Sequence, residues 1–552
     1  MAPRRSSRAP STKPASKPAA ESAAPKPING SKRAASPERK EAPPSKRSRS
    51  VAPKSENEPP VKPPSRKPRS KTAAAKAAAE PAPKKARKLS PIREAQPAPS
   101  TQQLKLYFNP LPTPPKKQRP GLLPFAWGTG NFGQFGMGPD VLDELPKPKR
   151  NLWAEAEMEK NSFGENKAGM EFVASGGLHT IFIDEKGTVW TCGVNDDAAL
   201  GRITQNVPDP NNPGSFLSVD DLTAIPHPLP TLIDEGFRAV KAVAGDSICA
   251  AVSDKGELRV WGSFRANEGS LGFSTGLQHQ YTPVPILELS HKPGDIEKVS
   301  SIAAGSNHLL VLTTHGHIYS WGAGEQAQLG RKVLERRKMN GTVPEKVTLG
   351  TRGRKAVTVG AGAFHSFAVD DNGDVWGWGL NSMGQTGTGF SSSEDSVVQL
   401  PQKVKNLSKE ELGADIVVQV AGGTHHTLFL LQSGKVYATG RSSAGQLGLP
   451  EDHPAFKDRA DDEFVPEPVL VPFPDPNDPI VGISCGPHNS AAVTRGGALY
   501  AWGQGVQGEL GLGDVEEAKI PQVVVRKDGG AWFAAAVSCG GQHTVGLFRK
   551  KN

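Results

Sequence analysis

The 552-residue chain is poor in the features that define several protein classes. It has four cysteines, none in a CxxC pair, and only 6% aromatic residues. No apolar run approaches the about 18 residues that a membrane helix needs, and MAPRRSSRAP lacks the apolar core of a secretory signal. We therefore expect an intracellular protein with no membrane partner and with reduced thiols in its core. The cysteines are Cys192, Cys249, Cys485 and Cys539.

Patterns of catalysis and cofactor binding are also missing. The sequence has no GxxxxGK[ST] phosphate loop, no zinc spacing and no evident Ser/His/Asp set. We therefore expect no nucleotide, metal ion or other cofactor on this chain. It is predicted to act by binding and not by bond chemistry of its own.

A glycine-flanked hairpin recurs through most of the chain. The clearest copy spans residues 421–448, where apolar and β-branched residues flank the turn at Ser433 and Gly434. Successive copies lie about 55 to 70 residues apart, and such a period indicates a solenoid, a propeller or an array. The copies start at Gly176, Gly245, Gly305, Gly362, Gly422, Gly486 and Gly540.

The two ends of this array complement each other. The copy at Gly540 has no return strand, whereas 125–128 reads as a return strand with no hairpin before it. A closed ring explains both observations. About 30 further residues in most repeats add two strands to each hairpin, which makes four-stranded blades. We predict an all-β, seven-bladed β-propeller over residues 121–552, closed by pairing of its N- and C-terminal strands.

Residues 1–120 have a different composition. They contain 29 Lys or Arg and 7 Asp or Glu, so they carry +22 and leave −12 of the chain's net +10 to the remainder. Proline, alanine and serine fill much of the rest, and such a segment buries too little apolar surface to fold. We predict a disordered basic tail on an acidic body. Nucleic acid is the expected partner of the tail, bound through its phosphates and without reading of sequence.

The tail also carries short motifs. Two basic clusters are spaced like a bipartite nuclear import signal, and a third is dense enough to act alone. They predict recognition by a nuclear import receptor and a nuclear location, although a merely solvated charge run is the alternative. Ser36 and Ser90 each precede proline and resemble sites of proline-directed kinases. The basic residues are Lys32, Arg33, Lys46, Arg47 and Arg49, and Lys84, Lys85, Arg87 and Lys88.

The repeats carry a family resemblance. WGTGNFGQFGMG at Trp127, WGAGEQAQLG at Trp321 and WGQGVQGELGLG at Trp502 alternate with GGxHT starts. This pattern resembles the regulator of chromosome condensation family, whose fold is a seven-bladed propeller. The basic tail, the absence of an appended domain and VWGSFRANEGSLG at 260–272 are similar to its chromatin-bound members, the guanine-nucleotide exchange factors for the nuclear GTPase Ran. That resemblance implies promotion of GDP release, in support of nucleocytoplasmic transport and mitotic organisation.

The resemblance also implies a set of GTPase-binding residues. The loop 264–271 corresponds to a β-wedge that presses on the phosphate-binding region of the GTPase, and the alternative is an ordinary blade loop. Asn131 and Asn307 stand where carboxylates are expected, and amides supply no charge to a lysine-rich partner. The wedge residues are Phe264, Arg265, Ala266, Asn267, Glu268, Gly269, Ser270 and Leu271. The other implied residues are Asp246, His425, His543, Asn131 and Asn307.

Histidine recurs at one position of the repeat. One residue per blade is distributed round a ring and does not converge on a metal or catalytic site, so we interpret most of these side chains as structural. His425 is the member that we expect to be functional. The set comprises His179, His308, His365, His425 and His543, with Ile248 and Asn489 at the same position in other repeats.

A basic loop at 331–338 stands out within the acidic body. A similar loop in the family contacts the acidic surface of the histone core, so the resemblance implies nucleosome binding, which we expect on the face opposite the wedge. A solvated loop is the alternative. The residues are Arg331, Lys332, Arg336, Arg337 and Lys338.

Three functions of other classes are alternatives for this sequence. A chromatin-binding scaffold without exchange activity explains the tail but not the wedge. A plant-type ultraviolet photoreceptor needs clustered tryptophans, whereas most tryptophans here lie in the repeat strands. A ubiquitin ligase built on these repeats needs an appended catalytic domain, for which the chain has no room.

Overall fold

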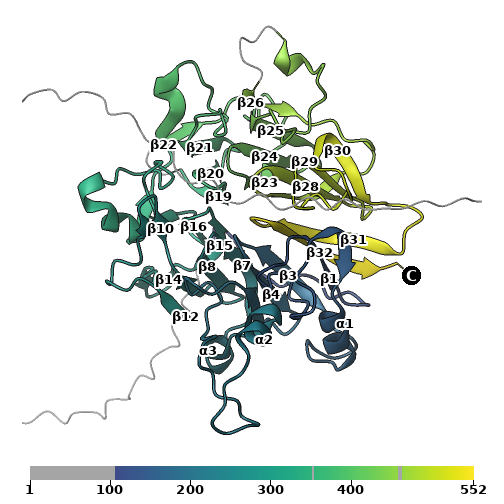
Figure 1. Cartoon of the computed structure of the whole chain (residues 1–552). Helices are drawn as coiled ribbons and strands as arrows, with labels where there is room; N and C mark the ends of the chain where they lie inside the picture. The colour runs from purple at the N-terminus through teal and green to yellow at the C-terminus, as the bar shows by residue number, and fades with distance from the viewer. Residues whose placement is uncertain (1–105, 351–353, 458–462, 552) are drawn as a thin grey trace, which may run out of the picture. The chain divides into compact units, whose positions relative to one another are not determined.

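The computed structural model describes residues 106–350, 354–457 and 463–551 (Figure 1). Seven four-stranded antiparallel sheets surround a central channel, and each sheet is one blade. The predicted all-β, seven-bladed propeller is confirmed. The tail motifs, including Ser36 and Ser90, lie outside the described residues.

The first strand of each blade lines the channel. We number blades 1 to 7 by these inner strands, which are β3 (Met170–Ser175), β7 (Ala239–Ala244), β15 (Val299–Ala304), β19 (Ala356–Ala361), β23 (Val417–Gly422), β27 (Ile480–Cys485) and β31 (Trp532–Cys539). The second strands are β4 (His179–Asp184), β8 (Ile248–Ser253), β16 (His308–Thr313), β20 (His365–Asp370), β24 (His426–Leu431), β28 (Asn489–Thr494) and β32 (His543–Lys550).

The third and fourth strands complete each blade toward the rim. The third strands are β5 (Val189–Gly193), β9 (Leu258–Gly262), β17 (Ile318–Gly322), β21 (Val375–Leu380), β25 (Val436–Arg441), β29 (Leu499–Gln504) and β1 (Leu123–Gly128). The fourth strands are β6 (His227–Pro228), β12 (Gln280–Val284), β18 (Glu345–Val347), β22 (Val397–Lys403), β26 (Phe464–Leu470), β30 (Glu517–Val525) and β2 (Leu145–Arg150).

Short elements occupy the connections between strands. Two ribbons are formed by β10 (Arg265–Ala266) with β11 (Gly269–Ser270) and by β13 (His291–Lys292) with β14 (Asp295–Ile296). The helices are α1 (Leu152–Glu159), α2 (Val219–Ala224), α3 (Pro230–Asp234), η1 (Glu335–Thr342), η2 (Ser393–Ser396) and η3 (Pro454–Phe456). No helix in the described part of the chain is long and apolar enough to cross a membrane.

The ring closes in blade 7, where the two ends of the propeller meet. β1 pairs with β32 from Leu123 opposite Phe548 to Gly128 opposite His543, and β2 adds the outer strand. Phe125 packs on Phe548, with ring centroids 4.7 Å apart. The closure predicted from the phase of the repeats is confirmed, and it leaves no unpaired edge between β32 and β1.

Buried histidines connect neighbouring blades. Each reaches the side chain that follows the same repeat position in the next blade, as His308 Nε2 does with Ser366 Oγ at 2.8 Å. Burial lowers the pKa of His308 to about 3, so this ring stays neutral at physiological pH. The equivalent pairs are His179 with Cys249, His365 with Thr427, His426 with Ser490 and His543 with Thr180.

One member of the predicted histidine set was wrong. His426 and not His425 begins β24 and occupies the buried repeat position. The doubled histidine and doubled glycine of this repeat allow two alignments, and the strand register selects the one that starts at Gly423. His425 therefore lies one residue earlier, in the turn, where it is half-buried.

The propeller has two faces with different connections. The loop face carries the turns from first to second strands, such as 304–308, and the long connections from third to fourth strands. The turn face carries the tight turns from second to third strands, such as 313–317. The wedge follows β9 and the basic loop follows β17, so both lie on the loop face. The expectation that the basic loop lies opposite the wedge was wrong.

Residues 106–120, which the sequence assigned to the tail, contact the turn face. Asn109 is buried, and its Nδ2 donates to Thr313 O at 3.0 Å and to Ala356 O at 2.9 Å, so it joins blades 3 and 4. Further along, Arg119 forms an ion pair of 2.8 Å with Glu185 of blade 1. This segment belongs to the propeller, although its proline-rich sequence resembles the tail.

Candidate functional site

The loop 264–271 forms a small protruding ribbon. Arg265 pairs with Ser270 and Ala266 with Gly269, which leaves Asn267 and Glu268 at the tip. Gly269 has φ +118°, a conformation that glycine adopts far more readily than other residues. The tip is exposed, so the ribbon is available to a partner on the loop face.

The base of the ribbon belongs to the core of the propeller. Phe264 is fully buried and packs on Phe273, with ring centroids 5.4 Å apart, and Leu271 is buried beside it. Of the eight predicted wedge residues, these two anchor the ribbon and are not positioned to contact a partner. The side chains of Arg265 and Glu268 are 53% and 76% exposed and offer charge of both signs.

The ribbon replaces a loop that has a structural role in other blades. In blades 4 and 6, the indole Nε1 of Trp378 and Trp502 donates at 2.9 Å to a carbonyl in the loop of the preceding blade. Trp127 and Trp261 make the same bond at 2.8 and 2.9 Å.

Trp321 of blade 3 is the exception among these tryptophans. It is fully buried, but its Nε1 has no hydrogen-bond partner among the described residues. The loop that precedes it is the ribbon, which lacks the carbonyl that the other loops provide. A buried donor without a partner costs about 1–3 kcal/mol. The departure of 264–271 from the repeat pattern is therefore expected to lower stability.

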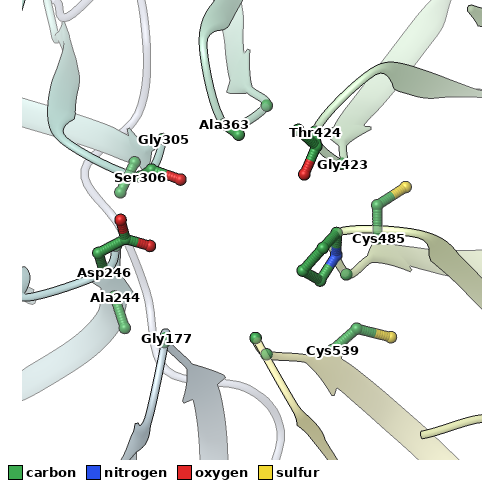
Figure 2. A pocket seen from close by; sticks show the side chains of 18 of the residues that line it. Gly177, Ala244, Asp246, Gly305, Ser306, Ala363, Gly423, Thr424, Cys485 and Cys539 are labelled. Atoms are coloured by element: carbon green, nitrogen blue, oxygen red, sulfur yellow. The ribbon is translucent and has the colours of Figure 1, made fainter. Parts of the chain in front are cut away.

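A carboxylate stands at the mouth of the channel on the loop face. Figure 2 shows Asp246 pointing into this opening, across from Thr424. Asn307 Nδ2 donates to Asp246 Oδ2 at 3.1 Å, while Asn307 Oδ1 accepts from the backbone N–H of Arg265 at 2.9 Å. Partial desolvation at the mouth raises the pKa of Asp246, and the amide of Asn307 and the charge of Arg265 oppose that rise. Asn307 thus joins Asp246 to the ribbon.

A second acidic group lies on the other flank of the ribbon. Asp197 of blade 1 forms an ion pair of 3.3 Å with Arg265 and accepts hydrogen bonds from His279 Nε2 at 3.2 Å and Ser247 Oγ at 3.1 Å. With Asp196 and Asp246 it lines a cavity of about 380 Å³. Asp197 was not predicted from the sequence. The sequence shows that Asp197 lies in a repeat loop. It does not show that Asp197 contacts residues of the next blade.

The remaining predicted residues are dispersed round the ring. His425 lies in blade 5 near Arg441 and His488, and its pKa is lowered by desolvation and by both neighbours. Asn131 is exposed in the connection between β1 and β2. His543 is fully buried in blade 7 and is therefore not positioned to contact a partner. Of the residues predicted to bind the GTPase, Asp246 and Asn307 lie next to the ribbon in the described part of the chain.

The basic loop contacts the ribbon. Lys338 forms an ion pair with Glu268 at the ribbon's tip. Arg331 turns into its own loop, where it donates to the carbonyls of Gly341 and Val343 and pairs with Glu345 at 3.2 Å. The exposed cations of this loop are Lys332, Arg336 and Arg337.

No cluster of three or more histidine, cysteine or acidic side chains within the described ranges is arranged to hold a metal ion. The arrangement instead provides a protruding ribbon of mixed charge beside an opening that carries the carboxylate of Asp246. Such a surface is suited to contact with a macromolecular partner.

Comparison with known proteins identifies close relatives. The chain is 30% identical to the guanine nucleotide exchange factor SRM1 of Saccharomyces cerevisiae over 76% of this chain and 86% of SRM1. It is 32% identical to the human protein named regulator of chromosome condensation, over 78% of this chain and 91% of the human one.

A solved structure shares the fold. The crystal structure of Prp20p from Saccharomyces cerevisiae covers 81% of this chain and 94% of its own, with a TM-score of 0.65 and 29% identity. The family model described as RCC1-like domain matches residues 124–546, which is the whole ring of blades. The chain therefore belongs to the family of RCC1-like domain proteins.

Proposed function

We propose that this chain is a guanine-nucleotide exchange factor for the nuclear GTPase Ran, and that it works while bound to chromatin. Its relative SRM1 is named an exchange factor, and Prp20p has been described for its binding to Gsp1p and histones. The observation that carries the proposal is the ribbon at 264–271. It interrupts a repeated loop and leaves Trp321 unpaired, a loss of stability that a purely structural loop does not explain.

The proposed mechanism is displacement. A small GTPase holds GDP through contacts to its phosphates from the P-loop backbone, a lysine and Mg²⁺. A protein that binds the nucleotide-free form more tightly weakens nucleotide binding by the same factor. In this proposal the ribbon pushes on the phosphate-binding loop, while Asp246 competes for its lysine. The factor favours neither GDP nor GTP, and the surrounding nucleotide concentrations set the direction.

The other predicted residues take separate parts in the proposal. Asn307 holds Asp246 and the ribbon, and His425 and Asn131 extend the contact round the loop face. His543 supports blade 7 from the core. The chain itself carries out no bond chemistry.

Chromatin and import partners belong to the basic parts of the chain. We assign DNA phosphate binding and recognition by a nuclear import receptor to the tail, which implies a nuclear location; a related structure holds yeast RCC1 (Prp20) bound to Kap60. The basic loop keeps Lys332, Arg336 and Arg337 exposed for the acidic histone surface. Because this loop lies beside the ribbon, the tail is assigned the contact that keeps the chain on chromatin during exchange. Changing Arg336 and Arg337 to Glu is expected to weaken nucleosome binding without altering nucleotide exchange.

A nucleotide-release assay tests the proposed function. Ran loaded with a fluorescent GDP analogue is mixed with the purified chain, and with a second small GTPase as a control. The proposal requires accelerated release from Ran at catalytic amounts of the chain. Release at the intrinsic rate, together with retained nucleosome binding, favours instead a chromatin-binding scaffold without exchange activity.

A further inference from the structure

The ribbon is too short to hold its own shape. Each strand contributes two residues, and a two-stranded ribbon is marginally stable in water even when it is longer. Its base is fixed by Phe264, but the tip at Asn267 and Glu268 extends beyond the core. Contacts from outside the ribbon are therefore needed to fix the tip.

Blade 3 provides such a contact through Glu325. Both carboxylate oxygens of Glu325 accept from the backbone N–H of Asn267, at 3.2 and 3.1 Å. A carboxylate that accepts from a backbone N–H makes a charge-assisted hydrogen bond, which is stronger than a neutral one. Glu325 thus holds the tip residue through its backbone N–H and not through its side chain.

Further contacts hold both flanks of the ribbon. Lys338 pairs with Glu268 from the same blade as Glu325, whereas Asp197 reaches Arg265 from blade 1. Asn307 accepts from the backbone N–H of Arg265. The ribbon of blade 2 is therefore clamped between blades 1 and 3 by charged and amide groups.

We propose that Glu325 is a positioning residue for nucleotide exchange, which holds the tip of the ribbon in the orientation that meets the GTPase, with Asp197 supporting the opposite flank. This inference rests on the proposed function. Fixing a loop before binding removes the ordering cost from the association step. Glu325 acts through Asn267 and not by touching the GTPase.

Release kinetics with matched variants test this inference. Glu325→Ala is expected to lower kcat/KM for GDP release from Ran about tenfold, whereas Glu325→Gln, which keeps one acceptor oxygen, recovers most of the rate. Glu410→Ala is the control, because Glu410 is an exposed glutamate between β22 and β23 on the turn face. It is expected to leave the rate unchanged.

A double variant separates positioning from direct contact. Asn267→Pro removes the N–H that Glu325 accepts, so Glu325→Ala combined with Asn267→Pro is expected to be no slower than Asn267→Pro alone. Additive losses overturn the proposal, because they place Glu325 in direct contact with the GTPase. An unchanged rate for Glu325→Ala overturns it as well.

Amide hydrogen exchange tests the clamp without the GTPase. Glu325→Ala is expected to accelerate exchange at 265–270 while the melting temperature stays at the wild-type value. Unaltered exchange there overturns the clamp. If the wild-type chain fails to accelerate GDP release, the proposed function fails. The hydrogen-exchange measurement still decides whether Glu325 holds the ribbon.

Discussion

The unpaired indole of Trp321 leads to a differential prediction about stability. Trp321 and Trp378 occupy the same repeat position and are both fully buried, so replacing each with phenylalanine removes the same atoms from similar surroundings. The packing loss is therefore shared between the two variants. What differs is the hydrogen bond, because Trp378 Nε1 donates to Gln328 O at 2.9 Å and Trp321 Nε1 has no partner in the described chain.

The magnitude follows from that difference. Trp378→Phe loses a bond worth about 1 kcal/mol, while Gln328 O keeps its bond from Ser366 Oγ. Trp321→Phe removes an unpaired donor whose burial costs about 1–3 kcal/mol. Trp378→Phe is therefore expected to lower the free energy of unfolding by about 2–4 kcal/mol more than Trp321→Phe.

Urea unfolding of both variants measures this difference, with the slope of the transition checked for constancy. Trp502→Phe serves as the control and is expected to behave like Trp378→Phe, since Trp502 Nε1 also donates to a loop carbonyl, at 2.9 Å. Equal destabilisation of all three variants refutes the reasoning. That result means that Trp321 Nε1 has a hydrogen-bond partner in solution. The ribbon then has no cost in stability that a functional role must explain.

Three further predictions concern the ring. Deleting residues 1–105 is expected to leave the urea midpoint unchanged, whereas Asn109→Ala lowers the free energy of unfolding by about 2 kcal/mol through two lost buried hydrogen bonds; an unchanged midpoint for Asn109→Ala detaches that segment from the fold. Burial lowers the pKa of His308 to about 3, so its contribution to stability is present above about pH 6.5, where the unfolded histidine loses its proton, and falls by about 1.4 kcal/mol per pH unit below it. His308→Asn, which copies Asn489 of blade 6, is expected to reduce the pH dependence of the free energy of urea unfolding by about half a proton on average between pH 7.5 and 5.5, and an unaltered dependence contradicts the assignment. Deleting residues 125–136 removes most of β1 and exposes β32, so the single cooperative melting transition is expected to be lost, and a native melting curve argues against closure in blade 7.

The ring was predictable because it depends on periodicity and phase. The hairpin that starts at Gly540 lacked a return strand, and the strand at 125–128 lacked a partner. In the structure these two segments pair with each other. The apolar first strand of the hairpin at 421–448 is β24, the second strand of its blade, and all six of its residues are buried.

The errors came from information that a linear pattern does not carry. The repeat at Gly422 fits two registers, and only strand pairing separates His425 from His426. The face of the basic loop at 331–338 depends on which pair of strands it connects. A segment such as 106–120 has too few apolar residues to predict its packing, and yet a single buried Asn109 holds it.

The candidate site was predictable only in part. The resemblance to the family marked the loop 264–271, and the structure shows that it forms a ribbon. The residues that hold it, Asp197 and Glu325, lie in the loops of neighbouring blades, about 60 to 70 positions away from their partners. Their roles follow from the closeness of the blades, which the sequence does not display.

The most direct test of the central claim is GDP release from Ran after removal of the ribbon. Residues 265–268 are replaced by a short Gly-Ser turn, with Phe264 and Leu271 kept as anchors. The account predicts that stimulated release falls about 30-fold or more, which is the effect of removing a binding hot spot of about 2 kcal/mol. The urea unfolding curve is expected to stay native. Undiminished release by a natively folded ribbon-replaced protein contradicts the account.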